Sequence, residues 1–244
     1  MPEAHVEATT GVSVFLAGIL LKVGGFAYIR FLYGLFPLGN FFFLDFMYSL
    51  AVISCLWAAL MSIRQFDMKR IIAYMSIAHM SLALLALNSF TVVGLLGSVL
   101  LFLSHGLVSS ALFMLVGVLY EQHQVRQLGY YAGLRAVIPC FSFYFIFFIF
   151  CNINFPGTAG FITEIFLCVG LSFISYFLVF INFVSSFFLV VASLHLLRVL
   201  YGLSSKFALR VLGDLSYEEH VSFFFLAAAT LFIGLSPMFF VSSL

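Results

Sequence analysis

The sequence predicts an all-α fold, a polytopic transmembrane helix bundle of about seven spans with one discontinuous helix broken near Asn152–Thr158. Of its 244 residues, 64% are hydrophobic and 8% are charged, whereas a soluble domain usually carries ~25% charged residues. Apolar runs of about 18 or more residues recur along the chain, and each is long enough to cross the hydrocarbon core of a bilayer. Lys and Arg gather in alternate connections between these runs.

The apolar runs between helix-breaking residues give the expected spans in chain order. They cover 9–34, 41–63, 69–89, 91–120, 134–172, 175–203 and 221–243. The fifth run is too long for one straight helix and contains Pro156 and Gly157. Proline lacks the backbone donor that a helix needs and glycine is flexible, so the helix is expected to stop or kink there. The run forms either one discontinuous span or two full spans.

Charge placement favours the discontinuous span. With it, the basic segments fall on the membrane face that carries the N-terminus, namely those around Arg64, Lys69, Arg70, Arg126, Arg135, Lys206 and Arg210. The opposite connections, near 35–40, 89–91 and 173–175, contain no Lys or Arg. By the positive-inside rule, the basic face is cytoplasmic, or faces the matrix in a mitochondrion.

Four ionisable side chains are expected near the middle of their spans: Lys22, His79, His105 and Glu164. A charge at the bilayer centre costs about 2.5–3.5 kcal/mol even on lenient scales, so such residues usually serve an ion or proton pathway. Histidine titrates near neutral pH and can pass a proton between its two ring nitrogens. These residues predict a proton pathway. A static Lys–Glu pair and structurally hydrogen-bonded histidines remain the alternatives.

The sequence predicts no metal, haem or nucleic-acid site. The four cysteines form no Cys-x-x-Cys pair, and His5 with its acidic neighbours lacks a fourth metal ligand. A b-type haem between His79 and His105 would leave Lys22 and Glu164 unexplained. The net charge of +1 gives no basic surface for nucleic acid.

Several segments resemble one known family, in order along the whole chain. They are PEAHVEA followed by GILLK, RQFDMKRIIAYMSIAHM, SHGLVSSALFMLVGVLYEQHQVR, FPGTAGFITEIF, ASLHLLRVLYG and GLSPMFF. The family is subunit 4 of NADH:ubiquinone oxidoreductase (respiratory complex I), an antiporter-like proton-translocating subunit related to the Mrp-type antiporters. The resemblance implies that the chain couples NADH oxidation by ubiquinone to proton pumping as a non-redox component of that enzyme. An Mrp-type cation/proton antiporter subunit is the alternative function.

The resemblance also implies roles for the four mid-membrane residues. Lys22 matches the lysine of the central hydrophilic axis, His79 and His105 match the bridging histidines, and Glu164 matches the glutamate of the second broken helix. In the family pattern, 1–244 is one membrane domain. It comprises the last helix of the first antiporter-like repeat, the second five-helix repeat and a terminal helix, at roughly 9–34, 41–203 and 221–243.

The implied setting is the mitochondrial inner membrane, with the N-terminus and charged loops on the matrix side. Because PEAHVEA lies in the middle of the family's subunits, we expect a C-terminal half of a split subunit 4, with a separate chain supplying the N-terminal half. A truncated subunit is the alternative. The other expected partners are the complex I membrane-arm subunits and membrane lipids. No cofactor is expected in this chain, and NADH, FMN, iron–sulfur clusters and ubiquinone are expected in partner subunits.

Overall fold

The structure, a computed structural model, describes residues 2–131, 133–201 and 213–237. Every regular element in these ranges is a helix, so the expected all-α class is confirmed. Lys206 and Arg210 lie outside the described residues, as do the expected helix ends at 203 and 238–243.

The first span is an irregular helical run, Thr10–Tyr33, preceded by the short helix α1 (Pro2–Glu7). Extended backbone at Thr9 separates the two. The run consists of α2 (Thr10–Phe15), a π-helical segment η1 (Leu16–Leu20), α3 (Leu21–Ala27) and a second π-helical segment η2 (Tyr28–Tyr33). π-Helical turns occur frequently at functional sites, and here they flank the segment that carries Lys22.

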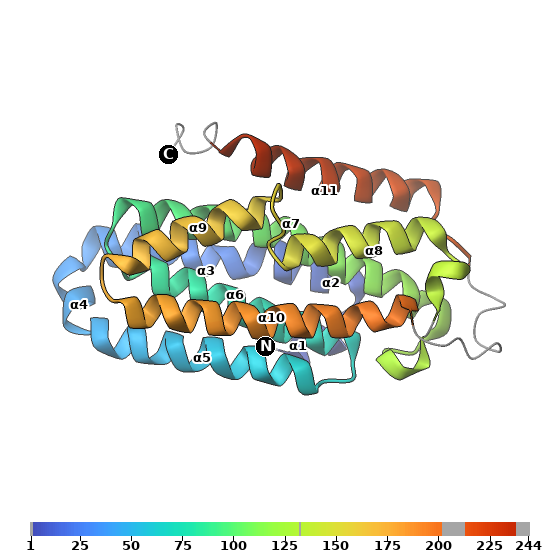
Figure 1. The fold of residues 1–244 in the computed structure, drawn as a ribbon, viewed down its shortest axis with the longest axis horizontal. Coiled ribbons are helices and arrows are strands. Elements are labelled where there is room, and N and C mark those ends of the chain that lie inside the picture. Colours follow the sequence, from blue (N-terminus) through green and yellow to red (C-terminus); the bar gives the residue numbers. More distant parts are fainter. Residues whose placement is uncertain (1, 132, 202–212, 238–244) are drawn as a thin grey trace.

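Apart from one short helix at an end, the remaining helices run along the length of the bundle (Figure 1). They are α4 (Pro37–Phe42), α5 (Leu44–Arg64), α6 (Met68–Leu87), α7 (Val92–His123), α8 (Pro139–Asn152), α9 (Ala159–Ser172), α10 (Tyr176–Tyr201) and α11 (Tyr217–Leu235). Within the described ranges, 6 helical runs are long and apolar enough to cross a membrane. Helices α8 and α9 have 14 residues each, about 21 Å, too short to cross alone. Lying end to end, they form the single discontinuous span (Figure 1).

The break between α8 and α9 follows from its residues. Asn154 and Gly157 have φ of 62° and 93°, left-handed values that Asn and Gly tolerate best. Gly160 leaves room for the Asn154 side chain, because a Cβ on Gly160 would lie 2.0 Å from Asn154 Oδ1. The expected helix break at Pro156 and Gly157 is therefore confirmed.

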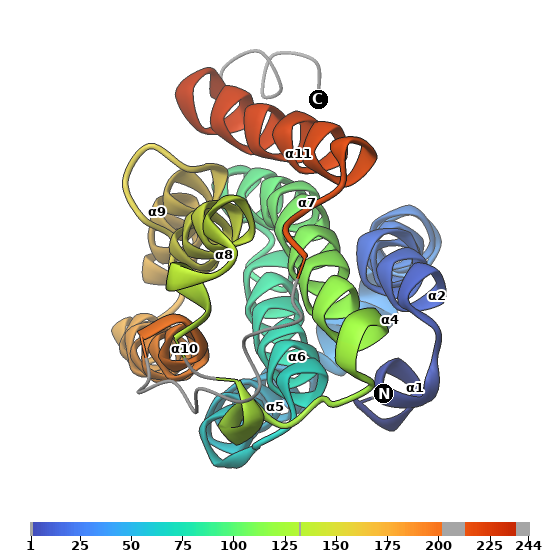
Figure 2. The same cartoon turned by 90° about the vertical axis from the view of Figure 1, so that its right-hand side faces the viewer.

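Helices α6 and α7 form the centre of the bundle, as the view along its long axis shows (Figure 2). Of the most apolar stretch of each helix, 72% is buried in α6 and 78% in α7, against 22% in Thr10–Tyr33 and in α11. Small residues allow close packing between membrane helices. At the contact of α7 with α9, a Cβ on Gly170 would lie 2.6 Å from the Gly94 Cα. This close approach fixes the helix that carries Glu164 against the centre.

The connections that carry Arg64 and Arg126 meet at one end of the bundle. The Met68 N–H donates to the Arg126 carbonyl at 3.1 Å, and the Leu128 N–H donates to the Phe66 carbonyl at 2.8 Å. Helix α4 and the connection between α9 and α10 lie at the opposite end (Figure 1). Charged and uncharged connections therefore segregate in this part of the chain, as the sequence predicts.

Asp214 closes the N-terminus of α8 from a distant part of the chain. Its carboxylate oxygens accept from the N–H groups of Cys140 and Phe141, each at 3.0 Å. Desolvation raises the pKa of Asp214, but backbone donors from Cys140, Leu215 and Phe141 outweigh it and hold the pKa below its usual value. The segment before α11 is thus tied to the start of α8.

Candidate functional site

Lys22 contacts a histidine of the central helix α7. Its Nζ lies 3.0 Å from His105 Nδ1, and it also donates to the carbonyl of Ala17, five residues earlier. The approach is close because Gly106 has no side chain, and a Cβ there would lie 3.2 Å from the Gly18 carbonyl oxygen. A neutral imidazole nitrogen can accept a proton from an ammonium group, so the contact suits proton exchange.

The second histidine extends this contact toward α9. His79 on α6 and His105 on α7 are 4% and 5% exposed, and their ring centroids lie 5.3 Å apart. His79 Nε2 is buried and has no hydrogen-bond partner among the described residues. A histidine buried in this way has one ring nitrogen available to a neighbouring proton carrier.

Two small cavities continue the line beyond His79. One is lined by His79, His105 and Ser104, and the other by His79 and Glu164; both also contact Asn152 and Asn154. Each cavity has room for about one water molecule. Proton transfer over this gap would use a bridging water or a side-chain movement.

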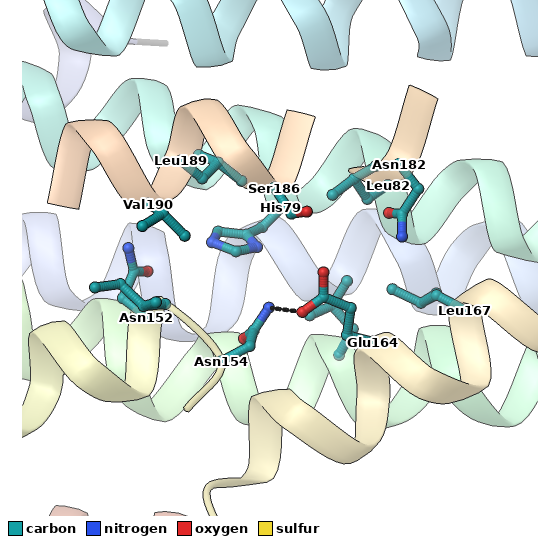
Figure 3. Close-up of a pocket in the computed structure, with 12 residues that line it drawn as sticks. His79, Leu82, Asn152, Asn154, Glu164, Leu167, Asn182, Ser186, Leu189 and Val190 are labelled. Carbon is teal, nitrogen blue, oxygen red and sulfur yellow. Dashed lines mark hydrogen bonds between the residues drawn. The ribbon is translucent and has the colours of Figure 1, made fainter. Parts of the chain in front are cut away.

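Glu164 lies at the end of the line, against the broken helix (Figure 3). Asn154, in the break itself, donates its Nδ2 to Glu164 Oε2 at 3.1 Å. The left-handed backbone at Asn154 takes the chain out of the α8 helix, and the Asn154 side chain lies toward α9. The break thus supplies a hydrogen-bond donor to the carboxylate.

The structure brings all four predicted residues into one line, in the order Lys22, His105, His79 and Glu164. Lys22 and Glu164 make no ion pair with each other. Lys22 contacts His105 and Ala17, whereas Glu164 accepts from Asn154. The alternative of a static Lys–Glu pair is therefore wrong. The role of the line in proton transfer stays a prediction.

The sequence reasoning missed the polar side chains that line the cavities between the histidines and Glu164. They are Ser104, Asn152, Asn154, Asn182 and Ser186. Asn152 donates to Ser193 Oγ at 3.0 Å, which ties α8 to α10. Isolated asparagines in apolar runs gave a signal, but only the three-dimensional packing shows that they surround Glu164.

His5 belongs to a different environment, outside the spans. It is fully buried and its ring stacks on Phe113, with 4.8 Å between centroids. Desolvation lowers the pKa of His5, and the N-terminal amine, Lys69 and Lys22 lower it further by their positive charge. Within the described ranges, no three His, Cys, Asp or Glu side chains lie together as metal ligands would.

The fold and this line of residues define a class: a multi-pass helical membrane subunit with a lysine–histidine–glutamate line, whose histidines are buried and whose ends are partly buried, and a broken helix. Residues 1–189 match the family model described as NADH:quinone oxidoreductase/Mrp antiporter, transmembrane. The chain belongs to this family.

Curated relatives of this chain include NADH-ubiquinone oxidoreductase chain 4 proteins. NADH-ubiquinone oxidoreductase chain 4 of Chondrus crispus is 48% identical over 165 residues, which cover 68% of this chain and 34% of that protein. The chain 4 protein of Prototheca wickerhamii is 40% identical over 241 residues, covering 97% of this chain and 46% of the relative. This chain therefore spans less than half the length of these two relatives.

Solved structures show the same fold. A chain of respiratory complex I from Thermus thermophilus with bound NADH superposes with a TM-score of 0.90 at 28% identity, covering 98% of this chain and 50% of that one. A chain of the Mrp complex from Dietzia sp. DQ12-45-1b gives a TM-score of 0.88 at 16% identity, covering 98% and 53% respectively. The Mrp likeness shows the fold alone.

Proposed function

We propose that this chain is a proton-translocating part of a subunit 4 in the membrane arm of NADH:ubiquinone oxidoreductase. The observation that carries the proposal is the contact between Lys22 and His105, with His79 and Glu164 following in one line inside the bundle. Buried ionisable groups inside a membrane bundle are costly and mark ion or proton pathways. The relatives named as chain 4 support the respiratory setting.

Each residue has a defined part in the proposed transfer. Lys22 carries an exchangeable proton, His105 accepts it at Nδ1, and His79 passes it toward the cavity. Glu164 receives it at the carboxylate that Asn154 orients. A change of charge near Lys22, transmitted from the redox reaction elsewhere in the enzyme, would start the transfer.

The redox chemistry of the proposed enzyme belongs to other subunits. NADH, FMN, iron–sulfur clusters and ubiquinone bind in partner chains, and this chain contributes no redox centre. Its immediate partners are the neighbouring membrane-arm subunits, membrane lipids and the polypeptide that supplies the N-terminal region of subunit 4, which we expect to be a separate chain.

The proposed location is the mitochondrial inner membrane, with the N-terminus and basic loops facing the matrix. Segregation of charged connections at one end of the bundle supports a fixed orientation. The run Thr10–Tyr33 would close a first antiporter-like repeat, α5 to α10 would form the second, and α11 would be the terminal helix. These elements would together make one membrane domain.

Glu164→Gln in the assembled complex tests the proposal, because glutamine keeps the shape and removes the titratable group. The number of protons pumped per NADH oxidised, measured in sealed vesicles, should fall. Glu218→Gln on α11 is the matched control, since Glu218 is an exposed residue away from the line. An unchanged ratio in Glu164→Gln would contradict the proposal. Migration of the chain apart from NADH dehydrogenase activity on a native gel would favour an Mrp-type cation/proton antiporter instead.

A further inference from the structure

Asn182 on α10 is a buried amide that the proposed proton line does not use. It is 1% exposed, and its Nδ2 donates to Cys168 Sγ at 3.2 Å. Its Oδ1 is buried and has no hydrogen-bond partner among the described residues. Leaving a buried acceptor unpaired is costly, so this oxygen calls for an explanation.

The amide lines the cavity that Glu164 also lines. Figure 3 shows the Asn182 amide and the Glu164 carboxylate along the same cavity, with Asn154 bonded to Glu164 on the other side. Cys168 lies one helical turn after Glu164 on α9, so the thiol ties the Asn182 amide to the helix that carries the carboxylate. Asn182 is thus held beside Glu164 by a partner that is itself close to Glu164.

The two ends of an amide have nearly the same size but opposite hydrogen-bonding character. One end accepts through oxygen and the other donates through nitrogen, so a half-turn of the group exchanges the two without repacking. The Cys168 thiol suits either orientation, because S–H is a weak donor and sulfur is a weak acceptor. The side of Asn182 that faces the cavity can therefore be an acceptor or a donor.

We propose that Asn182 is a positioning residue that turns with the charge of Glu164. When Glu164 is protonated, the Asn182 carbonyl, whose oxygen is unpaired in the structure, faces the cavity and accepts a hydrogen bond from the O–H of the carboxylic acid, directly or through one water. When Glu164 is ionised, the NH₂ group faces the cavity and donates to the carboxylate. This role rests on the proposed function, in which Glu164 changes charge during turnover.

Few other groups can respond to Glu164 in this part of the structure. His79 reaches the cavity from α6, Asn154 reaches it from the break, and Ser186 reaches it from α10 beside Asn182. Asn152 at the end of α8 also lines the cavity, but its Nδ2 already donates to Ser193. Helix α7 contributes only the apolar Leu101 at this point, and Lys22 and His105 lie beyond His79. Asn154 already donates to Glu164, so Asn182 is the neighbouring amide whose cavity-facing atom is unpaired.

The test measures the protonation of Glu164 in the assembled complex. A membrane-permeant carbodiimide reacts with protonated carboxyl groups in apolar surroundings, and mass spectrometry of the peptide quantifies labelling of Glu164 across a pH series. Asn182→Leu removes the donor that stabilises the ionised carboxylate. We expect its labelling curve to move by about one pH unit to higher pH, the effect of one hydrogen bond to a charged group.

Two further variants make the result decisive. Asn182→Met fills the same space with an adaptable side chain, and it should shift the curve in the same direction if Asn182→Leu does not assemble. Asn40→Leu is the matched control, since Asn40 is a buried asparagine (5% exposed) on α4 that does not line the cavity, and its curve should match the wild type. A wild-type curve in an assembled Asn182 variant would overturn the inference.

The outcomes separate this inference from the proposed function. If Glu164→Gln lowers pumping while Asn182 variants label like the wild type, the inference alone fails. If Asn182 variants shift the labelling curve while Glu164→Gln pumps normally, Asn182 responds to Glu164 as proposed, and the pumping role of Glu164 fails.

Discussion

Lys22 Nζ lies 3.0 Å from His105 Nδ1, across the interface between the irregular first span and the central helix α7. The lysine is held in this position by the carbonyl of Ala17 in the π-helical turn before it. The position of the Lys22 ammonium group beside His105 therefore depends on the π-helical geometry of the preceding turn.

Lys22→Met should abolish most proton pumping coupled to NADH oxidation, because methionine fills the space but cannot exchange a proton. The proton-to-electron ratio in sealed vesicles measures the effect. Arg30→Gln, an exposed cation further along the same helical run, is the control and should leave the ratio unchanged. Equal ratios in Lys22→Met and wild type would show that Lys22 is not a proton carrier.

Gly160→Ala should displace Asn154, because the new Cβ would lie 2.0 Å from Asn154 Oδ1. Overpacking of this kind costs about 1–3 kcal/mol, and loss of the bond to Glu164 adds to the effect. The thermal midpoint of the purified complex should therefore fall, and proton pumping should fall with it. Gly11→Ala is the matched control, since its Cβ would meet nothing within 4 Å. A stable, fully pumping Gly160→Ala variant would contradict the role of this contact.

Asp214 should make the start of α8 sensitive to acid. Its folded pKa is lowered, so its contribution to stability is present above the unfolded value of about 3.9 and is lost as the pH falls through the folded pKa. Because Asp214 is exposed, the effect is expected to stay within ~1 kcal/mol. Asp214→Asn should lower the thermal midpoint at pH 7 and leave it nearly unchanged near pH 3. Asp45→Asn, an exposed aspartate on α5, serves as the control. An equal loss at both pH values would show that charge is not involved.

Hydropathy and charge placement predict the bundle well, because membrane spans must be long and apolar whatever they pack against. The same reasoning resolves the fifth span, where Pro156 and Gly157 interrupt an overlong apolar run. The short helices α1 and α4 and the π-helical turns are not predicted, since their formation depends on neighbouring helices and not on local periodicity.

The residues of the candidate site could be predicted from the sequence, but their order in space and their contacts could not. A lone charge in an apolar run signals a costly burial, which identifies Lys22 and Glu164. The order of the histidines and the turn of Asn154 toward Glu164 depend on which helix faces which, and no local pattern in the chain records that. Asn182 is the clearest case, because a single asparagine among apolar residues becomes informative only when its unpaired oxygen and its cavity are seen together.

The division of one membrane span into two short rods has a mechanical consequence. A continuous helix would transmit a push at Glu164 along its full length, whereas the irregular segment 153–158 separates α9 from α8. The far end of α8 is anchored by Asp214, and α9 is packed through Gly170 against α7. Both helices are thus anchored, α8 at its start and α9 at Gly170, and the irregular segment between them limits how far a displacement at Glu164 can pass into α8.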